Sequence, residues 1–211
     1  MRMTEYVLLA GSSLFVIVNP IGTVPAFLAM TPTDTMARRN QMAKLACCVM
    51  AGVLLVFAVA GTWIFKLFGI TLSTFQMAGS VVLLLIALDM LRAQRSLVQE
   101  TEEETAAGTI KDDIAITPLA VPMLAGPGAI STAILLHGQA DGIAQRIALY
   151  LCIGAISIVT YFIFRFSARG TAWLTPIAMK LATRLMGLML AAIAFQFMVN
   201  ALRDLKVIPP P

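Results

Sequence analysis

Six long apolar segments dominate the chain, and each is about as long as a helix that crosses a bilayer. Short polar stretches with proline, glycine and charged residues separate them. The segments are Tyr6–Met30, Ala43–Phe65, Thr74–Leu91, Ile116–Leu136, Arg146–Phe166 and Leu181–Leu202. We therefore predict an all-α membrane protein with six transmembrane helices.

The composition supports a bilayer as the solvent of this chain. Apolar residues make up 59% of the 211 residues and charged residues only 12%, about half their usual share in soluble domains. A soluble fold with this composition would expose large apolar patches and aggregate. The basic residues stand singly between apolar blocks, so the net charge of +4 does not indicate nucleic-acid binding.

Residue types that carry catalysis or bind metals are scarce. Cys47, Cys48 and Cys152 lie inside apolar runs without metal-ligand spacing, and the chain has one histidine, His137. The acidic run Glu102–Glu104 is typical of a solvated linker rather than a metal site. The chain also lacks an H-E-x-x-H motif, paired cysteines and an ATP-binding loop. We expect no enzyme activity, no cofactor, no metal site and no direct use of ATP.

The first segment shares one feature with a signal peptide, a basic residue, Arg2, that precedes the apolar run. The apolar run Tyr6–Met30 is too long for a signal sequence and contains Pro20 and Pro25. We interpret it as a retained span. Lysine and arginine residues near the predicted spans number ten on one side of the membrane and five on the other. The richer side is expected to be cytoplasmic, which places both termini outside.

Two of the predicted spans carry proline and glycine near their middle, in the runs Asn19–Ala26 and Gly126–Ala133. An offset of 107 residues superposes Pro20 on Pro127 and Asp89 on Gln196, and an offset of 108 superposes Gly79 on Gly187. We predict two three-helix repeats, residues 1–92 and 114–211, joined by a cytoplasmic connector, residues 93–113. An odd number of spans inverts the second repeat. The alternative is that membrane helices are simply richer in proline and glycine.

Proline breaks are tolerated in lipid only where protein or a wet cavity surrounds the freed backbone groups. The segments Asn19–Pro25 and Ala125–Ser131 should therefore face the interior of the bundle. A half-helix N-terminus offers amides to a carboxylate, and a C-terminus offers carbonyls to an ammonium group. Two opposed breaks could hold a zwitterion at the bilayer midplane without any buried charge.

The predicted binding residues lie at and beside the two breaks. Hydroxyl and amide groups supply hydrogen bonds, and glycines allow close approach to the backbone. The candidates are Asn19, Pro20, Gly22, Thr23, Pro25, Gly126, Pro127, Gly128, Ser131 and Thr132. The alternative is that the hydroxyls only bond to carbonyls of their own helix.

Two polar residues of the third and sixth spans are candidates for coupling or gating. Asp89 lies near the end of its span, where an ion pair with Arg92 is the simpler interpretation. Gln196 occupies the equivalent repeat position and could bond between helices.

Two stretches of the chain form specific motifs, Asn19–Phe27 and Pro118–Gly128, and three further stretches support them, Ala78–Ser80, Ala87–Leu91 and Arg184–Leu188. Together these stretches resemble the MarC/SnatA family of inner-membrane proteins. The resemblance covers nearly the whole chain and departs at Ser80, where the family more often has glycine.

The resemblance implies a bacterial inner-membrane transporter of small neutral amino acids such as glycine and alanine. We expect a secondary transporter, with export as one direction of flux and H⁺ or Na⁺ as the coupling ion. A homo-oligomer is compatible with the sequence. The alternatives are a drug or metabolite efflux protein and a regulatory membrane protein that transports nothing.

Overall fold

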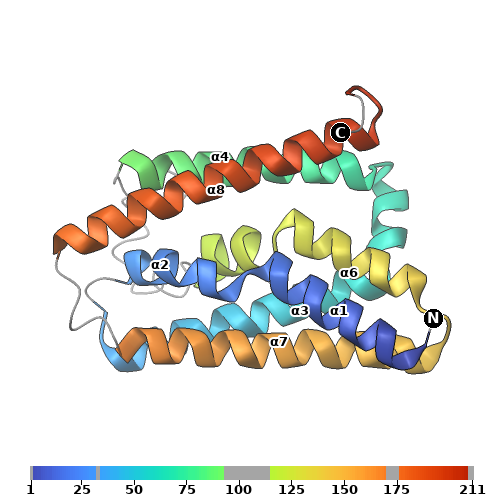
Figure 1. Ribbon diagram of the computed structural model, residues 1–211, viewed down its shortest axis with the longest axis horizontal. Helices are drawn as coiled ribbons and strands as arrows, with labels where there is room; N and C mark the ends of the chain where they lie inside the picture. The colour runs from blue at the N-terminus through green and yellow to red at the C-terminus, as the bar shows by residue number, and fades with distance from the viewer. Residues whose placement is uncertain (1, 32–33, 93–114, 170–175, 209–211) are drawn as a thin grey trace.

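The computed structural model describes residues 2–31, 34–92, 115–169 and 176–208, and these form helices with short turns (Figure 1). The predicted connector with Glu102–Glu104 lies outside the described residues. The elements in chain order are α1 (Met3–Val18), α2 (Pro20–Met30), α3 (Met36–Phe68), α4 (Leu72–Arg92), η2 (Ala115–Leu124), α6 (Pro127–Gln139), α7 (Ile143–Arg169) and α8 (Pro176–Asp204).

The described helices include several that can cross a membrane. Four stretches pass by length and apolar character, namely Met3–Met30, Met36–Phe68, Leu72–Arg92 and Ile143–Arg169. The bent pair of η2 and α6 adds a fifth if it is counted as one span. The prediction of an all-α multi-pass membrane protein is confirmed. The predicted sixth span lies within the 29-residue helix α8, and the number six stays a prediction.

The first predicted interruption is a single residue wide. Asn19 has left-handed backbone angles (φ 48°, ψ 60°), which asparagine tolerates better than most residues, and it separates α1 from α2. Helix α2 begins directly after Asn19 with Pro20 in its first turn. The N–H group that proline lacks would have no acceptor within the helix at this position. Pro25 lies inside α2, so the expectation of a break extending to Pro25 is wrong. Only one helical hydrogen bond, to the Ile21 carbonyl, is lost to this proline.

The second interruption is longer than predicted and begins earlier. Thr117 and Val121, each preceding a proline, adopt extended backbone angles inside η2. A residue before proline is driven away from helical angles by the proline ring. Helix α6 then begins at Pro127, and the two segments meet at a bend of 57°.

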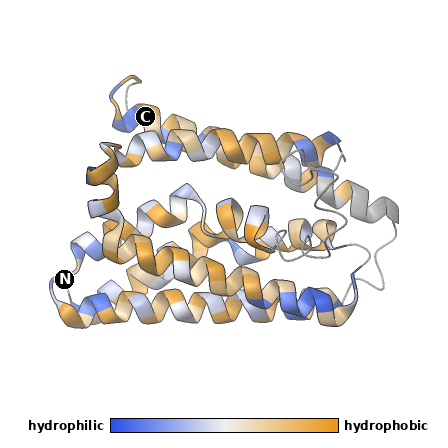
Figure 2. Ribbon diagram, turned by 180° about the vertical axis from the view of Figure 1, so that it is seen from behind, coloured by the Kyte–Doolittle hydropathy of each residue, from blue (hydrophilic) through white to orange (hydrophobic). Residues whose placement is uncertain are grey.

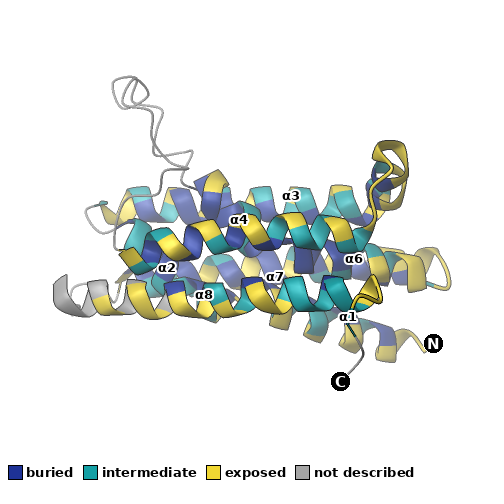
Figure 3. Cartoon of the chain, turned by 90° about the horizontal axis from the view of Figure 1, so that it is seen from above, coloured by how far each residue is buried: buried dark blue, intermediate teal, exposed yellow. Residues whose placement is uncertain are grey.

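Many large apolar residues are exposed on the outside of the bundle, and the ribbon of Figure 2 is coloured hydrophobic along most of its helices. Leu8 is 73% exposed, Val16 is 70% exposed and Leu151 is 69% exposed. The exposed positions follow the outer faces of the helices along their length (Figure 3). A chain built this way requires lipid around it.

The charged residues and the termini gather at the ends of the bundle. The N-terminus of α1 and the C-terminus of α8 lie at the same end (Figure 1). The opposite end holds the start of α3 with Arg38 and Lys44 and the ends of α4 and α7 with Arg92 and Arg169. The predicted grouping of basic residues is thus present, while the side of the membrane that each end faces stays a prediction.

Arg39 connects the ends of two helices at the basic end of the bundle. The side chain is only 6% exposed. Its Nε and Nη2 atoms donate to the Thr31 carbonyl at 2.9 and 2.7 Å, and Nη1 donates to the Ala168 carbonyl at 3.4 Å. Thr31 caps α2, and Ala168 lies in the last turn of α7. The guanidinium therefore supplies donors to carbonyls that a helix end leaves unbonded.

Replacing Arg39 with glutamine should lower the free energy of unfolding by about 1–3 kcal/mol, because buried carbonyls lose their donors. The matched control is Arg38→Gln, since Arg38 is only half-buried and bonds to the side chain of Gln41. Thermal unfolding of the purified protein in detergent, followed by intrinsic fluorescence, measures both variants. Equal losses in the two variants would contradict this role of Arg39.

Candidate functional site

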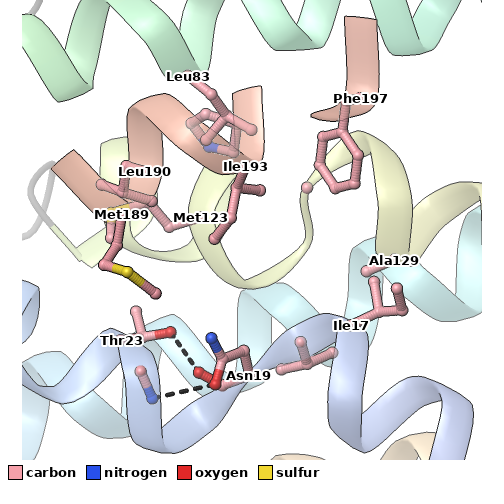
Figure 4. A pocket seen from close by; sticks show the side chains of 14 residues that line it. Ile17, Asn19, Thr23, Leu83, Met123, Ala129, Met189, Leu190, Ile193 and Phe197 are labelled. Carbon is pink, nitrogen blue, oxygen red and sulfur yellow. Dashed lines mark hydrogen bonds between the residues drawn. The ribbon is translucent and has the colours of Figure 1, made fainter. Parts of the chain in front are cut away.

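A cavity of about 70 Å³ lies between the two interrupted segments (Figure 4). Both breaks contribute to its wall, and α4 and α8 close it from the other side. Its lining residues are Ile17, Val18, Asn19, Gly22, Thr23, Leu83, Pro122, Met123, Gly126, Ala129, Met189, Leu190, Ile193 and Phe197. None of these side chains carries a charge.

Asn19 is a polar residue of the cavity lining, and it hydrogen-bonds backbone groups on both sides of the first break. Its backbone amide donates to Phe15 O at 3.0 Å, which ends α1. Its side-chain Oδ1 accepts from the Gly22 amide at 3.1 Å and caps α2. Gly22 is required here because a Cβ at that position would collide with the Asn19 side chain. The Asn19 amide nitrogen is left turned toward the cavity (Figure 4).

Thr23 lies one turn further along α2 and is 6% exposed. Its hydroxyl donates to the Asn19 carbonyl at 2.8 Å. A hydroxyl that donates one bond still has lone pairs with which to accept another. Thr23 thus hydrogen-bonds a backbone carbonyl at the break and also lines the cavity.

The second break leaves a helix N-terminus without a side-chain cap. Gly126 occupies the N-cap of α6, and a Cβ there would lie 2.5 Å from Pro122 O. The Ile130 amide donates to Gly126 O at 3.0 Å. The preceding amides, of Gly128 and Ala129, belong to the first helical turn, whose donors have no carbonyl partner within the helix. The N-terminus of α6 therefore presents a positive dipole beside the cavity.

Apolar side chains complete the wall of the cavity. Met189, Ile193 and Phe197 recur every four residues on one face of α8, and Leu83 comes from α4. The spacing on α8 is visible in the sequence, but an apolar stripe facing a cavity looks the same as one facing lipid. Our sequence interpretation therefore missed these residues, and it also missed Met123 and Ala129.

The predicted binding residues separate into two groups. Asn19, Gly22, Thr23 and Gly126 line the cavity. Pro20, Pro25, Pro127 and Gly128 do not, although they shape the segments around it. Two of them pack closely: a Cβ on Gly79 would lie 2.5 Å from the Pro127 ring, and a Cβ on Gly128 would lie 2.5 Å from the Phe197 ring.

Ser131 and Thr132 lie on α6 away from the cavity lining. Ser131 donates to Pro127 O at 2.6 Å and Thr132 donates to Gly128 O at 2.8 Å, the bonding within one helix that we named as the alternative. Ser131 also accepts from Gln76 Nε2 of α4 at 3.0 Å. Thr132 lines a separate open groove between α1 and α6 together with Ser12 and Ser13.

The two coupling candidates also lie outside the cavity lining. Asp89 is half-buried near the end of α4. Gln196 is exposed and donates to Asn200 Oδ1 at 2.9 Å within α8, rather than to another helix. Among the residues that the structure describes, no group of three or more His, Cys, Asp or Glu side chains could hold a metal ion.

Comparison with known proteins identifies the family of this chain. Residues 4–206 match the model of the MarC family integral membrane proteins. A UPF0056 membrane protein of Methanocaldococcus jannaschii is 39% identical over 94% of this chain and 97% of its own length. The UPF0056 membrane protein YvbG of Bacillus subtilis is 37% identical over 91% of this chain and 92% of its own.

A third relative, the UPF0056 membrane protein YhcE of Escherichia coli, is 30% identical over 91% of this chain and 89% of its own length. No solved structure matches the chain. The names of these relatives state a membrane location and no substrate. The family match spans nearly the whole chain and includes the residues of both proline-glycine motifs. The chain therefore belongs to the MarC family of integral membrane proteins.

Proposed function

We propose that the protein is a secondary transporter of small neutral amino acids, of the glycine and alanine type, and that the cavity between the two breaks is its binding site. The observation that carries this proposal is that one uncharged cavity is lined by both interrupted segments. Interrupted membrane helices commonly form the substrate sites of secondary transporters. Export is the direction we favour, with H⁺ or Na⁺ as the coupling ion.

The polar groups around the cavity suit a zwitterion. The first-turn amide of Ala129, which lines the cavity, and the dipole of α6 attract a carboxylate. Carbonyls at the C-terminal end of α1, beside Ile17 and Val18, attract an ammonium group. Asn19 and Thr23 add an amide and a hydroxyl at the same place. A zwitterion with both ends bound in this way leaves no net charge buried in the membrane.

The apolar wall and the small volume set the size of the bound side chain. The cavity of about 70 Å³ is bounded by Leu190, Ile193 and Phe197. A large cationic drug would need a larger cavity and an acidic side chain as its partner. This cavity is small, and no acidic side chain lines it. The geometry thus favours a small amino acid over the drug-efflux alternative.

The packing of the helices supports an inverted repeat. Exchanging the halves maps α1–α2 onto η2–α6, α3 onto α7 and α4 onto α8. Helices α1 and α2 contact α7, and correspondingly η2 and α6 contact α3. Helix α2 contacts α8, and η2 and α6 contact α4. Pro20 and Pro127 each occupy the first turn after a break. These correspondences support alternating access around one central site.

Filling the cavity should block transport. Ile193→Trp places an indole into the cavity, and an overpacking cost of about 1–3 kcal/mol against the bound substrate corresponds to a loss of alanine uptake of about five- to 150-fold. The matched control is Phe195→Trp, because Phe195 lies on α8 but is 53% exposed. Uptake of labelled alanine into liposomes, under a proton or a sodium gradient, measures both. Wild-type protein that moves neither alanine nor glycine under either gradient would refute the proposed function.

Removing the hydroxyl of Thr23 should weaken substrate binding. Thr23→Val keeps the shape of the side chain and should raise the KM for alanine about three- to tenfold, the value of one hydrogen bond. Thr160→Val is the control. Thr160 is also buried and donates to a carbonyl of its own helix, Ile156 O at 2.7 Å, but it lies on α7 rather than in the cavity lining. If the two variants change KM equally, Thr23 serves only to repair its helix.

A further inference from the structure

The helices form two separately packed bodies. One buried cluster joins residues of α1, α2, α3, η2, α6 and α7, and we call these elements the scaffold. A second cluster joins Ile86, Ala87 and Met90 of α4 to Leu190 of α8. From the scaffold, Ala26 is buried in it, and Met30 and Met123 pack against it at partial burial. We call α4 and α8 the helix pair. Figure 1 shows the pair as a layer above the scaffold.

The helix pair is tightly joined within itself. Helix α4 makes its most extensive packing with α8. A Cβ on Gly187 of α8 would lie 2.9 Å from the Ala87 carbonyl and 3.0 Å from the Leu91 amide of α4. The two backbones are thus as close as a glycine permits. Such a contact holds two helices together as one unit.

The scaffold is joined across the two halves of the sequence. Phe27 of α2 stacks on Phe164 of α7 with ring centroids 4.7 Å apart. Tyr6 of α1 donates its hydroxyl to the Leu136 carbonyl of α6 at 2.8 Å. A Cβ on Gly61 of α3 would lie 2.6 Å from Ile134 of α6. These contacts link the first repeat to the second, so the repeats are poorly suited to move against each other as whole bodies.

The proposed binding site lies at the boundary between the two bodies. The helix pair contributes Leu83, Met189, Leu190, Ile193 and Phe197, and the scaffold contributes both breaks. Beside the site, the pair touches the scaffold through three close contacts, one of which is between Gly128 of α6 and the Phe197 ring of α8. Gly79 packs on the Pro127 ring, and Gln76 Nε2 donates to Ser131 Oγ at 3.0 Å. The other amide atom of Gln76, Oε1, is buried without a hydrogen-bond partner among the described residues.

We propose that transport moves the helix pair as one rigid body against the scaffold, and that the Gln76–Ser131 hydrogen bond is a latch that closes one side of the site. This inference rests on the proposed function, since it names the moving part of that transporter. The incomplete bonding of Gln76 fits a contact that forms and breaks, because a fully satisfied buried amide would cost more to separate. The movement differs from the rocking of one sequence half against the other.

Chemical cross-linking separates these two movements. In protein whose Cys47, Cys48 and Cys152 are replaced by alanine, the pairs Gln76→Cys with Ser131→Cys and Gly61→Cys with Ile134→Cys are each linked by a short bifunctional thiosulfonate. The first link joins the pair to the scaffold, and the second lies within the scaffold. Both join the first half of the sequence to the second. Each variant is compared with itself before linking and after reduction.

The first link should lower alanine uptake into liposomes about tenfold or more, reversibly on reduction, because the conformational step is blocked. The second link should leave uptake within about twofold of the unlinked protein, as expected for a contact that does not change during transport. Loss of uptake with both links would indicate rocking of the halves and overturn the proposal. Full uptake with the first link would overturn it as well.

A distance measurement tests the movement independently of the substrate. Spin labels at exposed Val81 of α4 and Val56 of α3 report on the pair against the scaffold, and labels at Val56 and Leu151 of α7 report within the scaffold. Gln76→Leu removes the latch and should shift only the first distance, by several ångströms, in pulsed EPR. A shift of the second distance, or none in the first, would contradict the proposal. Shifts as expected in a protein that transports no amino acid would instead reject only the proposed function.

Discussion

The absence of water inside a bilayer governs this structure, because every interrupted helix must find partners for its freed backbone groups within the protein. Asn19 meets this requirement at the first break by ending α1 with its backbone and capping α2 with its side chain. Hydroxyls on α2 and α6 bond back to carbonyls of the same breaks. Both breaks consequently lie against protein, and the space between them is the cavity.

The helices that follow the two breaks differ in their N-terminal capping, and this difference gives the cavity its polarity. The N-terminus of α2 is capped by Asn19, whereas the N-terminus of α6 begins at Gly126 and has no side chain to cap it. Donors therefore remain available on one wall, while the opposite wall from α8 is apolar. A cavity with these properties offers backbone dipoles and a defined shape, which supports the proposed small neutral solute over an ion with a net charge.

The division into two buried clusters relates the site to movement. Close contacts of glycine with backbone unite α4 and α8, and aromatic stacking and hydrogen bonds unite the remaining elements. The described contacts between the two bodies are limited to a few places, such as Ala26 in the cluster of the helix pair and Phe75 of α4 against Phe57 and Phe65 of α3. This supports the proposal that the bodies move at their boundary. The cavity that we propose as the binding site occupies this boundary, so a solute bound there contacts both bodies and can influence their relative position.

The sequence by itself determined the membrane class, the positions of four of the predicted spans and the first break at Asn19, because apolar length and proline act locally. It also identified four residues of the cavity lining, since glycines, a hydroxyl and an amide at a break are local signals. Only the tertiary structure decided that Pro25 stays helical, that Ser131 bonds to Gln76, and that Ile193 and Phe197 face the cavity. Those outcomes depend on which helices become neighbours, and an apolar stripe carries the same pattern whether it faces lipid or protein.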